Sequence, residues 1–202
     1  MALITPPAPL PLRNLKWRHP FPAQNNRSGW TGSSKVVGLP GATTWKASGD
    51  FVTQIGENRA RPWRGFFLAL CGPINTFRLL ATESQQTAAA NPTVRAGSGS
   101  SNTVLLQGLP ASSTVLTTGM LMTVPLPSGH ERLVGLTSDL VTNGAGQATG
   151  TFQPELGEVP ATGATVEIQN PWALMRQTSA EPGWDVDIGQ VYSFPFACEE
   201  AR

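Results

Sequence analysis

The chain has little charge, and this shortage removes several classes of function. Charged residues make up 13% of its 202 residues, about half the usual share in globular proteins. A surface with so little charge is weakly hydrated, which favours its coverage by partner proteins. The net charge of +1 leaves no strong field that would attract nucleic acid or an anionic membrane.

Cysteines and long apolar runs are also scarce. The only two cysteines, Cys71 and Cys198, are too few for a disulfide framework, and Cys71 lies in an apolar run where it should pack as a small hydrophobe. No apolar run reaches the roughly 18 residues of a membrane span. The start, Met1 to Leu12, lacks the basic region of a secretory signal. We therefore expect synthesis in a reducing cytoplasm and no membrane partner.

Lysine is nearly absent as well, since Lys16, Lys35 and Lys46 are the only lysines and arginine supplies the other basic residues. Arginine is favoured at protein interfaces because its planar group pairs with carboxylates and stacks on aromatic rings. A GC-rich genome would produce the same bias. Glycine and proline, at 21 and 18 residues, make the chain rich in turns.

The first third of the chain predicts an extended arm, short strands and one helix. Residues 1–24 are dominated by proline and favour extended geometry. Short apolar pieces then predict strands around 35–37 and 43–45. The helix is expected over residues 62–71, with Pro62 at its first position. Its apolar stripe, at helical spacing, consists of Trp63, Phe66, Phe67 and Leu70, and Gly72-Pro73 ends it.

The rest of the chain is predicted to be β-structure with one long loop. Residues 82–102 form a low-complexity tract that should be a loop. Short runs of β-forming residues separated by turn signals then predict a small barrel or sandwich; they are 103–106, 121–124, 132–136, 147–152 and 165–168. Further strands are expected at 172–175 and 184–188. We expect the final strands to pair with the start of the chain, which would make the segment between them an insertion.

Residues able to carry out chemistry are few and scattered. His19 and His130 have no partners at metal-ligand spacing, and His130 is expected to be a surface hairpin residue. Asp185 and Asp187 should lie on one face of a strand, as a glycosidase pair would, although the wet face of a half-buried strand has the same pattern. Glu199 and Glu200 are assigned to a solvated C-terminus. We expect no catalysis, no metal and no cofactor.

The six tryptophans leave two interpretations open. A platform of exposed rings could bind sugar, whereas large rings also fill cores and interfaces efficiently. Their scatter over different predicted elements favours core and interface. The six are Trp17, Trp30, Trp45, Trp63, Trp172 and Trp184.

One passage resembles a known family. An aromatic amphipathic helix that ends in glycine (62–72) and leads directly into a Phe-Arg-Leu strand (75–79) resembles distal tail and minor tail proteins of long-tailed bacteriophages. In these, a similar A-x-L-x-G-R … F-x-L passage precedes an inserted β module. Later motifs are similar too: Gly108-Leu109-Pro110, Thr118 to Leu121, Gly146-Gln147-Ala148-Thr149, Gln153 to Leu156 and Pro171 to Met175. The chain departs from the family at Cys71-Gly72-Pro73 and at Met120.

The resemblance, which covers residues 61–177, implies both a fold and a mechanical role. It implies a β-sandwich ring domain (25–95 with 170–202, including the helix 62–71), which carries an inserted small barrel-like β module (96–169) and a proline-rich arm (1–24). Such proteins form a homo-oligomeric ring, commonly of six copies, that joins the tail tube protein to the tail hub or baseplate in the virion. Interface candidates are Trp17, Arg18, Trp63, Arg64, Phe67, Arg78, Trp172 and Arg176. The alternatives are a carbohydrate-binding β-sandwich and a small hydrolase using Asp185 and Asp187.

Overall fold

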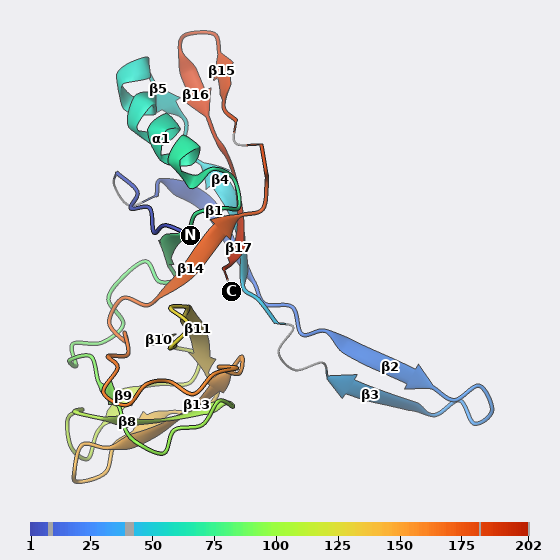
Figure 1. Ribbon diagram of the computed structural model, residues 1–202, viewed down its shortest axis with the longest axis vertical. Coiled ribbons are helices and arrows are strands. Elements are labelled where there is room, and N and C mark those ends of the chain that lie inside the picture. The colour runs from blue at the N-terminus through green and yellow to red at the C-terminus, as the bar shows by residue number, and fades with distance from the viewer. Residues whose placement is uncertain (8–9, 39–42, 182, 202) are drawn as a thin grey trace.

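The computed structural model describes residues 1–7, 10–38, 43–181 and 183–201. The fold is mainly β, with 41% strand and 7% helix, as predicted. Figure 1 shows an upper part with the helix, a lower part built only from strands and loops, and a two-stranded hairpin that projects to one side. Strands that are far apart in the sequence pair with each other in the upper part.

The upper part is organised by a five-stranded antiparallel sheet, here the first sheet. Its strand order is β1-β4-β17-β14-β6. The final strand pairs with the start of the chain, as expected, with Cys198 opposite Ala47. The strands are β1 (Leu12–Arg18), β4 (Lys46–Phe51), β6 (Phe77–Leu80), β14 (Trp172–Gln177) and β17 (Pro195–Glu200).

Strand β1 corrects the prediction of an unpaired arm over residues 1–24. It forms the edge of the first sheet, with Leu12 opposite Phe51 and Arg18 opposite Lys46. A register shift between Arg13 and Lys16 coincides with Asn14, whose φ is 51°, a left-handed conformation that asparagine tolerates. An edge strand tolerates such an irregularity and the prolines around it. Composition alone therefore underestimated the order of this segment.

Helix α1 (Glu57–Leu70) carries the predicted buried stripe but begins earlier than residue 62. Ala60 adds to that stripe, so the first turn already packs on the core, and Pro62 lies inside the helix. At the other end, Cys71 takes a left-handed conformation with φ of 50°. The Asn75 side chain donates a 2.9 Å hydrogen bond to the carbonyl of Ala69, which satisfies one of the unpaired carbonyls there. The helix thus ends where Gly72 and Pro73 predict.

An aromatic cluster attaches α1 to the first sheet. Phe67 stacks on Phe194 with ring centroids 5.1 Å apart, and Phe51 meets Trp63 edge-on at the same distance. Phe66 contacts Phe77 of β6, at 5.8 Å. Aromatic pairs of this kind contribute about 0.5–1.5 kcal/mol each beyond their buried area. The cluster makes this part of the molecule the core that the helix pattern predicts.

The lower part is a second five-stranded sheet with the order β10-β11-β13-β8-β7. All its strands lie in the chain between β6 and β14, which pair with each other in the first sheet. It has a separate hydrophobic core, which includes Phe152 and Leu106. Its strands are β7 (Thr93–Val94), β8 (Thr103–Gln107), β10 (Leu121–Pro125), β11 (Glu131–Leu136) and β13 (Ala148–Gln153), and β9 (Thr114–Leu116) pairs beside it with β12 (Leu140–Val141).

Four of the five strands predicted in this region are confirmed, within one residue at each end. The prediction of a strand at 165–168 is wrong, because Thr165 bridges Thr93 whereas Glu167 bridges Thr123. These isolated bridges join the segment to β7 and to β10, without a continuous ladder to either strand. The tract 82–102 is mostly loop, as predicted, apart from β7. The prediction at 43–45 is displaced, since β4 begins at Lys46.

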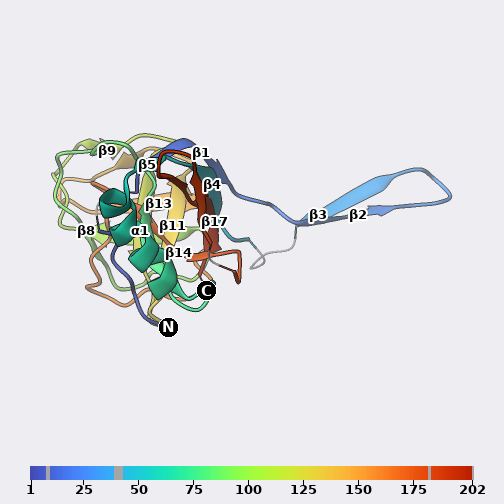
Figure 2. The ribbon, with the colours of Figure 1, turned by 90° about the horizontal axis from the view of Figure 1, so that it is seen from above.

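Two small sheets complete the fold. Strands β5 (Gln54–Ile55), β15 (Asp185–Asp187) and β16 (Val191–Ser193) form one of them, in the order β15-β16-β5 beside the helix. The other is the hairpin of β2 (Ala23–Arg27) and β3 (Ser34–Gly38). We call residues 23–38 the hairpin arm. Figure 2 shows it extending far from the rest of the molecule.

Candidate interaction surfaces

The eight predicted interface residues fall into three groups. Trp63 and Phe67 are buried in the core, at 7% and 3% exposure, so their assignment to an interface with another molecule is wrong. Their helical spacing was read correctly, but the stripe faces this chain's own first sheet. The other six are at least partly exposed, and four of them take part in ion pairs or cation–π contacts described below.

Arg78 and Trp172 come together and connect the two sheets. The Arg78 guanidinium lies 4.6 Å from the centre of the Trp172 ring and donates two hydrogen bonds to Glu131 of β11. The indole N–H of Trp172 donates to the same carboxylate at 2.6 Å. The hydrogen bond to Glu131 raises the pKa of Arg78 despite partial burial. Because Glu131 belongs to the second sheet, this cluster fastens β11 to β6 and β14.

The remaining candidates occupy the rim of the first sheet and of the helix. Arg64 lies 5.3 Å from the centre of the Trp184 ring and pairs with Glu57 at 3.0 Å. Arg176 pairs across strands with Glu199 at 2.8 Å. Half-buried pairs of this kind contribute about 1 kcal/mol or less.

Trp17 and Arg18 lie at the end of the edge strand β1, where the hairpin arm begins. Trp17 meets Trp45 edge-on at 6.0 Å, and the His19 ring also contacts Trp45, at 4.7 Å. Arg18 is exposed. These aromatic rings form the base from which the arm projects.

A buried ionic cluster at the junction of the two sheets was missed by the sequence analysis. Arg132 of β11 and Glu200 of β17 are fully buried, and their side chains form a hydrogen-bonded ion pair at 2.5 Å. His130 lies against the other carboxylate oxygen of Glu200, with Nε2 at 3.2 Å. The assignments of His130 to the surface and of Glu200 to a solvated C-terminus are therefore wrong. We call Arg132, Glu200 and His130 the junction cluster.

Backbone groups add hydrogen bonds to Glu200 and Arg132 of the junction cluster. The Trp45 amide donates to Glu200 Oε2 at 3.0 Å, while Arg132 donates to the carbonyls of Thr43 at 3.0 Å and of Glu155 at 3.2 Å. Burial alone would raise the pKa of Glu200. The hydrogen bond with His130 and the charge of Arg132 outweigh burial, so the pKa is lowered. Glu200 is therefore held as a carboxylate that cross-links the two sheets.

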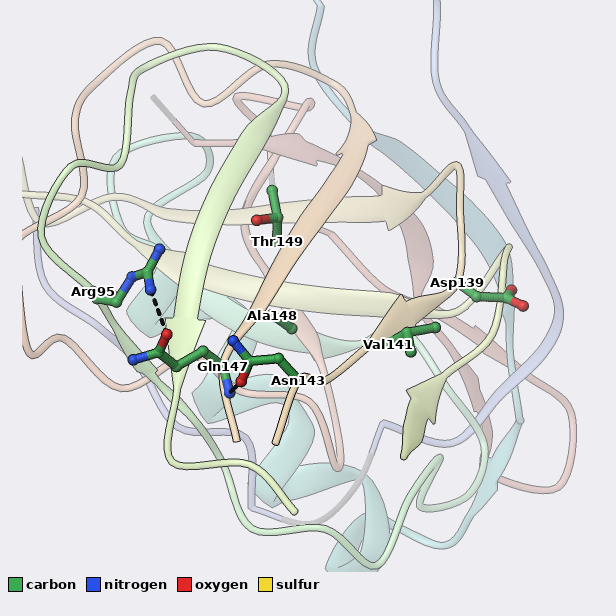
Figure 3. Close-up of a pocket in the computed structure, with 7 residues that line it drawn as sticks. All are labelled: Arg95, Asp139, Val141, Asn143, Gln147, Ala148 and Thr149. Atoms are coloured by element: carbon green, nitrogen blue, oxygen red, sulfur yellow. Dashed lines mark hydrogen bonds between the residues drawn. The ribbon is translucent and has the colours of Figure 1, made fainter. Parts of the chain in front are cut away.

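A surface hollow lies on the second sheet, and its lining residues form hydrogen bonds with neighbouring residues (Figure 3). Arg95 donates a 2.6 Å hydrogen bond to Gln147, which also lines the hollow. Asn143 accepts from the backbone of Ala145 and Gln147 and so stabilises the turn before β13. The amide and hydroxyl of Thr118 lower the pKa of Asp139 by donating to its carboxylate. These side chains hold turns in place.

Asp185 and Asp187 lie on one face of β15, as predicted, and both are exposed. Within the described part of the chain, no three or more His, Cys, Asp or Glu side chains are grouped so that they could hold a metal ion. In those same residues no helix has the length and apolar character needed to cross a membrane.

The hairpin arm projects from the rest of the molecule (Figure 2). Every residue of β2 and β3 is exposed, and the Trp30 side chain at the tip is 98% exposed. The tip is nevertheless ordered, because the Ser28 hydroxyl accepts from the amides of Trp30 and Thr31, at 3.3 and 3.2 Å. Sequence analysis predicted a strand at 35–37 but gave no indication that it would project from the molecule. Neither a protein-family model nor a curated protein matches this chain.

Proposed function

We propose that the chain is a structural subunit of a bacteriophage tail. In this role it forms an oligomeric ring that joins the tail tube to the tail hub or baseplate in the virion, without catalysis. The proposal extends the resemblance carried by α1 and β6, since the helix leads into Phe77-Arg78-Leu79 after the turn at Gly72. The single-helix β fold with strands inserted between β6 and β14 is compatible with it.

The hairpin arm is the observation that carries the proposal. An isolated two-stranded hairpin is marginally stable in water, and this arm has no exposed-to-buried alternation that would pack it on its own chain. A tryptophan with 98% exposure on an ordered tip supplies large apolar area at low entropic cost, as interface anchors do. An assembly subunit gains from such an arm a contact with its neighbour.

Light scattering on the purified full-length chain tests the proposal. A ring subunit should show a mass that rises with concentration to a defined multiple of 21.4 kDa and then stops rising, because closed symmetry limits growth. A chain that stays monomeric at the highest concentrations reached would contradict the proposal.

The exposure of Trp30 also supports the alternative, a carbohydrate-binding module for host-surface sugar, because a bare indole ring can stack on a sugar. Glycan-array binding by the wild-type chain that disappears in Trp30→Ala would favour this alternative. Equal signals from both proteins would not, since the ring would then have no part in binding.

A further inference from the structure

The hairpin arm belongs to a basic segment of the chain. Residues 1–49 contain Arg13, Lys16, Arg18, Arg27, Lys35 and Lys46 but no acidic residue, and the first acid is Asp50. The rest of the chain holds all 13 acidic residues and only eight arginines. The protein is therefore close to neutral overall but strongly polarised along its sequence. A basic arm of this kind favours an acidic partner, and the remainder of this same chain is acidic.

The register of the arm combines charge with apolar area. Asn25 lies opposite Val36, and Arg27 lies opposite Ser34, so Arg27 and Val36 share one face of the hairpin. Val36 is 64% exposed. Lys35 lies between these positions on the other face, beside Val37. The arm thus offers an apolar side chain next to a cation on each face, with Trp30 at the tip.

A complementary surface lies on the sheet of β5, β15 and β16. The register places Asp187, Val191 and Ile55 side by side across its three strands, with Asp185 next along β15. On the opposite face, Tyr192 is buried in the core beside the helix. The outer face therefore carries two exposed carboxylates beside Ile55, which is 66% exposed. Ile188, in the turn after β15, is 94% exposed.

We propose that the hairpin arm of one copy docks on the β5–β15–β16 sheet of a second copy. Val36 and Trp30 cover the apolar side chains Ile55 and Ile188, and Arg27, on the same face of the arm as Val36, approaches Asp185 and Asp187. Lys35 on the other face adds to the positive charge of the arm. Within one chain the arm points away from this sheet (Figure 1), so the contact forms between copies. It joins two different surfaces and is therefore head-to-tail, the type of contact that closes into rings. The inference deepens the proposed ring function and rests on it.

Charge reversal and rescue, measured by sedimentation velocity on the full-length chain, test this contact. The arm variant is Arg27→Glu/Lys35→Glu, and the sheet variant is Asp185→Lys/Asp187→Lys. Each should weaken self-association at least about tenfold, because like charges then face each other across the contact. The combined four-site variant restores opposite charges and should recover most of the lost association. All four positions are exposed, so folding should be unaffected, which unfolding midpoints would verify.

A matched control reverses one arginine and one lysine elsewhere, as Arg59→Glu/Lys46→Glu. Both residues are exposed and lie outside the arm and the sheet, so association should stay within about twofold of wild type if the effect is local rather than due to net charge. A wild-type chain that does not self-associate overturns the ring function itself. A chain that associates with unchanged strength in both variants overturns only the docking contact. Loss in the arm variant without rescue by the sheet changes also overturns it, and then assigns the arm to a different acidic partner.

Discussion

Replacing Arg132 by methionine should destabilise the protein strongly, because Glu200 would remain buried without its countercharge. Methionine is similar in length and removes hydrogen bonds to Glu200, Thr43 and Glu155. Breaking a buried ion pair on one side costs about 3–5 kcal/mol. Domains have a total stability of about 5–15 kcal/mol, so this loss is a large share. For a chain of this length it corresponds to a fall in Tm of about 6–20 °C.

Urea unfolding, followed by circular dichroism and tryptophan fluorescence, measures this effect. Trp45 is a suitable probe because its amide donates to Glu200 and its indole N–H to the carbonyl of Leu133, at 2.7 Å. The matched control is Arg176→Met, which breaks the half-exposed pair with Glu199 and should cost about 1 kcal/mol or less. The double variant Arg132→Met/Glu200→Leu removes both buried charges, so it should be much more stable than Arg132→Met alone. Equal losses in Arg132→Met and Arg176→Met would refute the role assigned to the junction cluster.

Three further predictions follow from burial and charge. The pKa of Glu200 is lowered in the folded chain, so the stability that its carboxylate contributes is present above the unfolded pKa near 4.5 and is lost as the pH falls through the folded pKa. The difference in unfolding free energy between wild type and Glu200→Gln, measured by urea titration, should therefore shrink below about pH 4.5. A difference that stays constant with pH would contradict this. A maleimide should label the exposed Cys71 in the native chain but Cys198 only after unfolding. Burial raises the pKa of the Cys198 thiol and so keeps it protonated. Rapid labelling of both cysteines in the native chain would contradict the fold near β17. Phe67→Ala should lower the free energy of unfolding by about 3–5 kcal/mol in thermal unfolding, because the ring stacks on Phe194 and contacts Phe51. The control Leu68→Ala, on the exposed face of the helix, should lower it far less.

Local sequence patterns predicted the elements that can be recognised from their own residues and bounding turns. The stripe of Trp63, Phe66, Phe67 and Leu70 required one buried face of a helix, and the structure buries all four. Runs of β-forming residues between turns likewise located most strands of the second sheet, because composition and bounding turns are local signals of a strand.

Features that depend on distant partners could not be read in the same way. His130 and Glu200 are 70 residues apart in sequence and meet only because β11 and β17 are brought together. In isolation, His130 follows a turn and Glu200 stands near the last residue, so both resemble surface positions. Strand β1 was missed for a related reason: its pairing with β4 overrides a proline-rich context. The helix began early because burial of Ala60 favours helix ahead of Pro62.

Electron microscopy of the purified full-length chain tests the central claim most directly. A ring-forming tail subunit should appear as closed rings, commonly of six copies, in which each hairpin arm reaches a neighbouring copy. Particles of single, separate chains at concentrations where light scattering is also monomeric would contradict the claim.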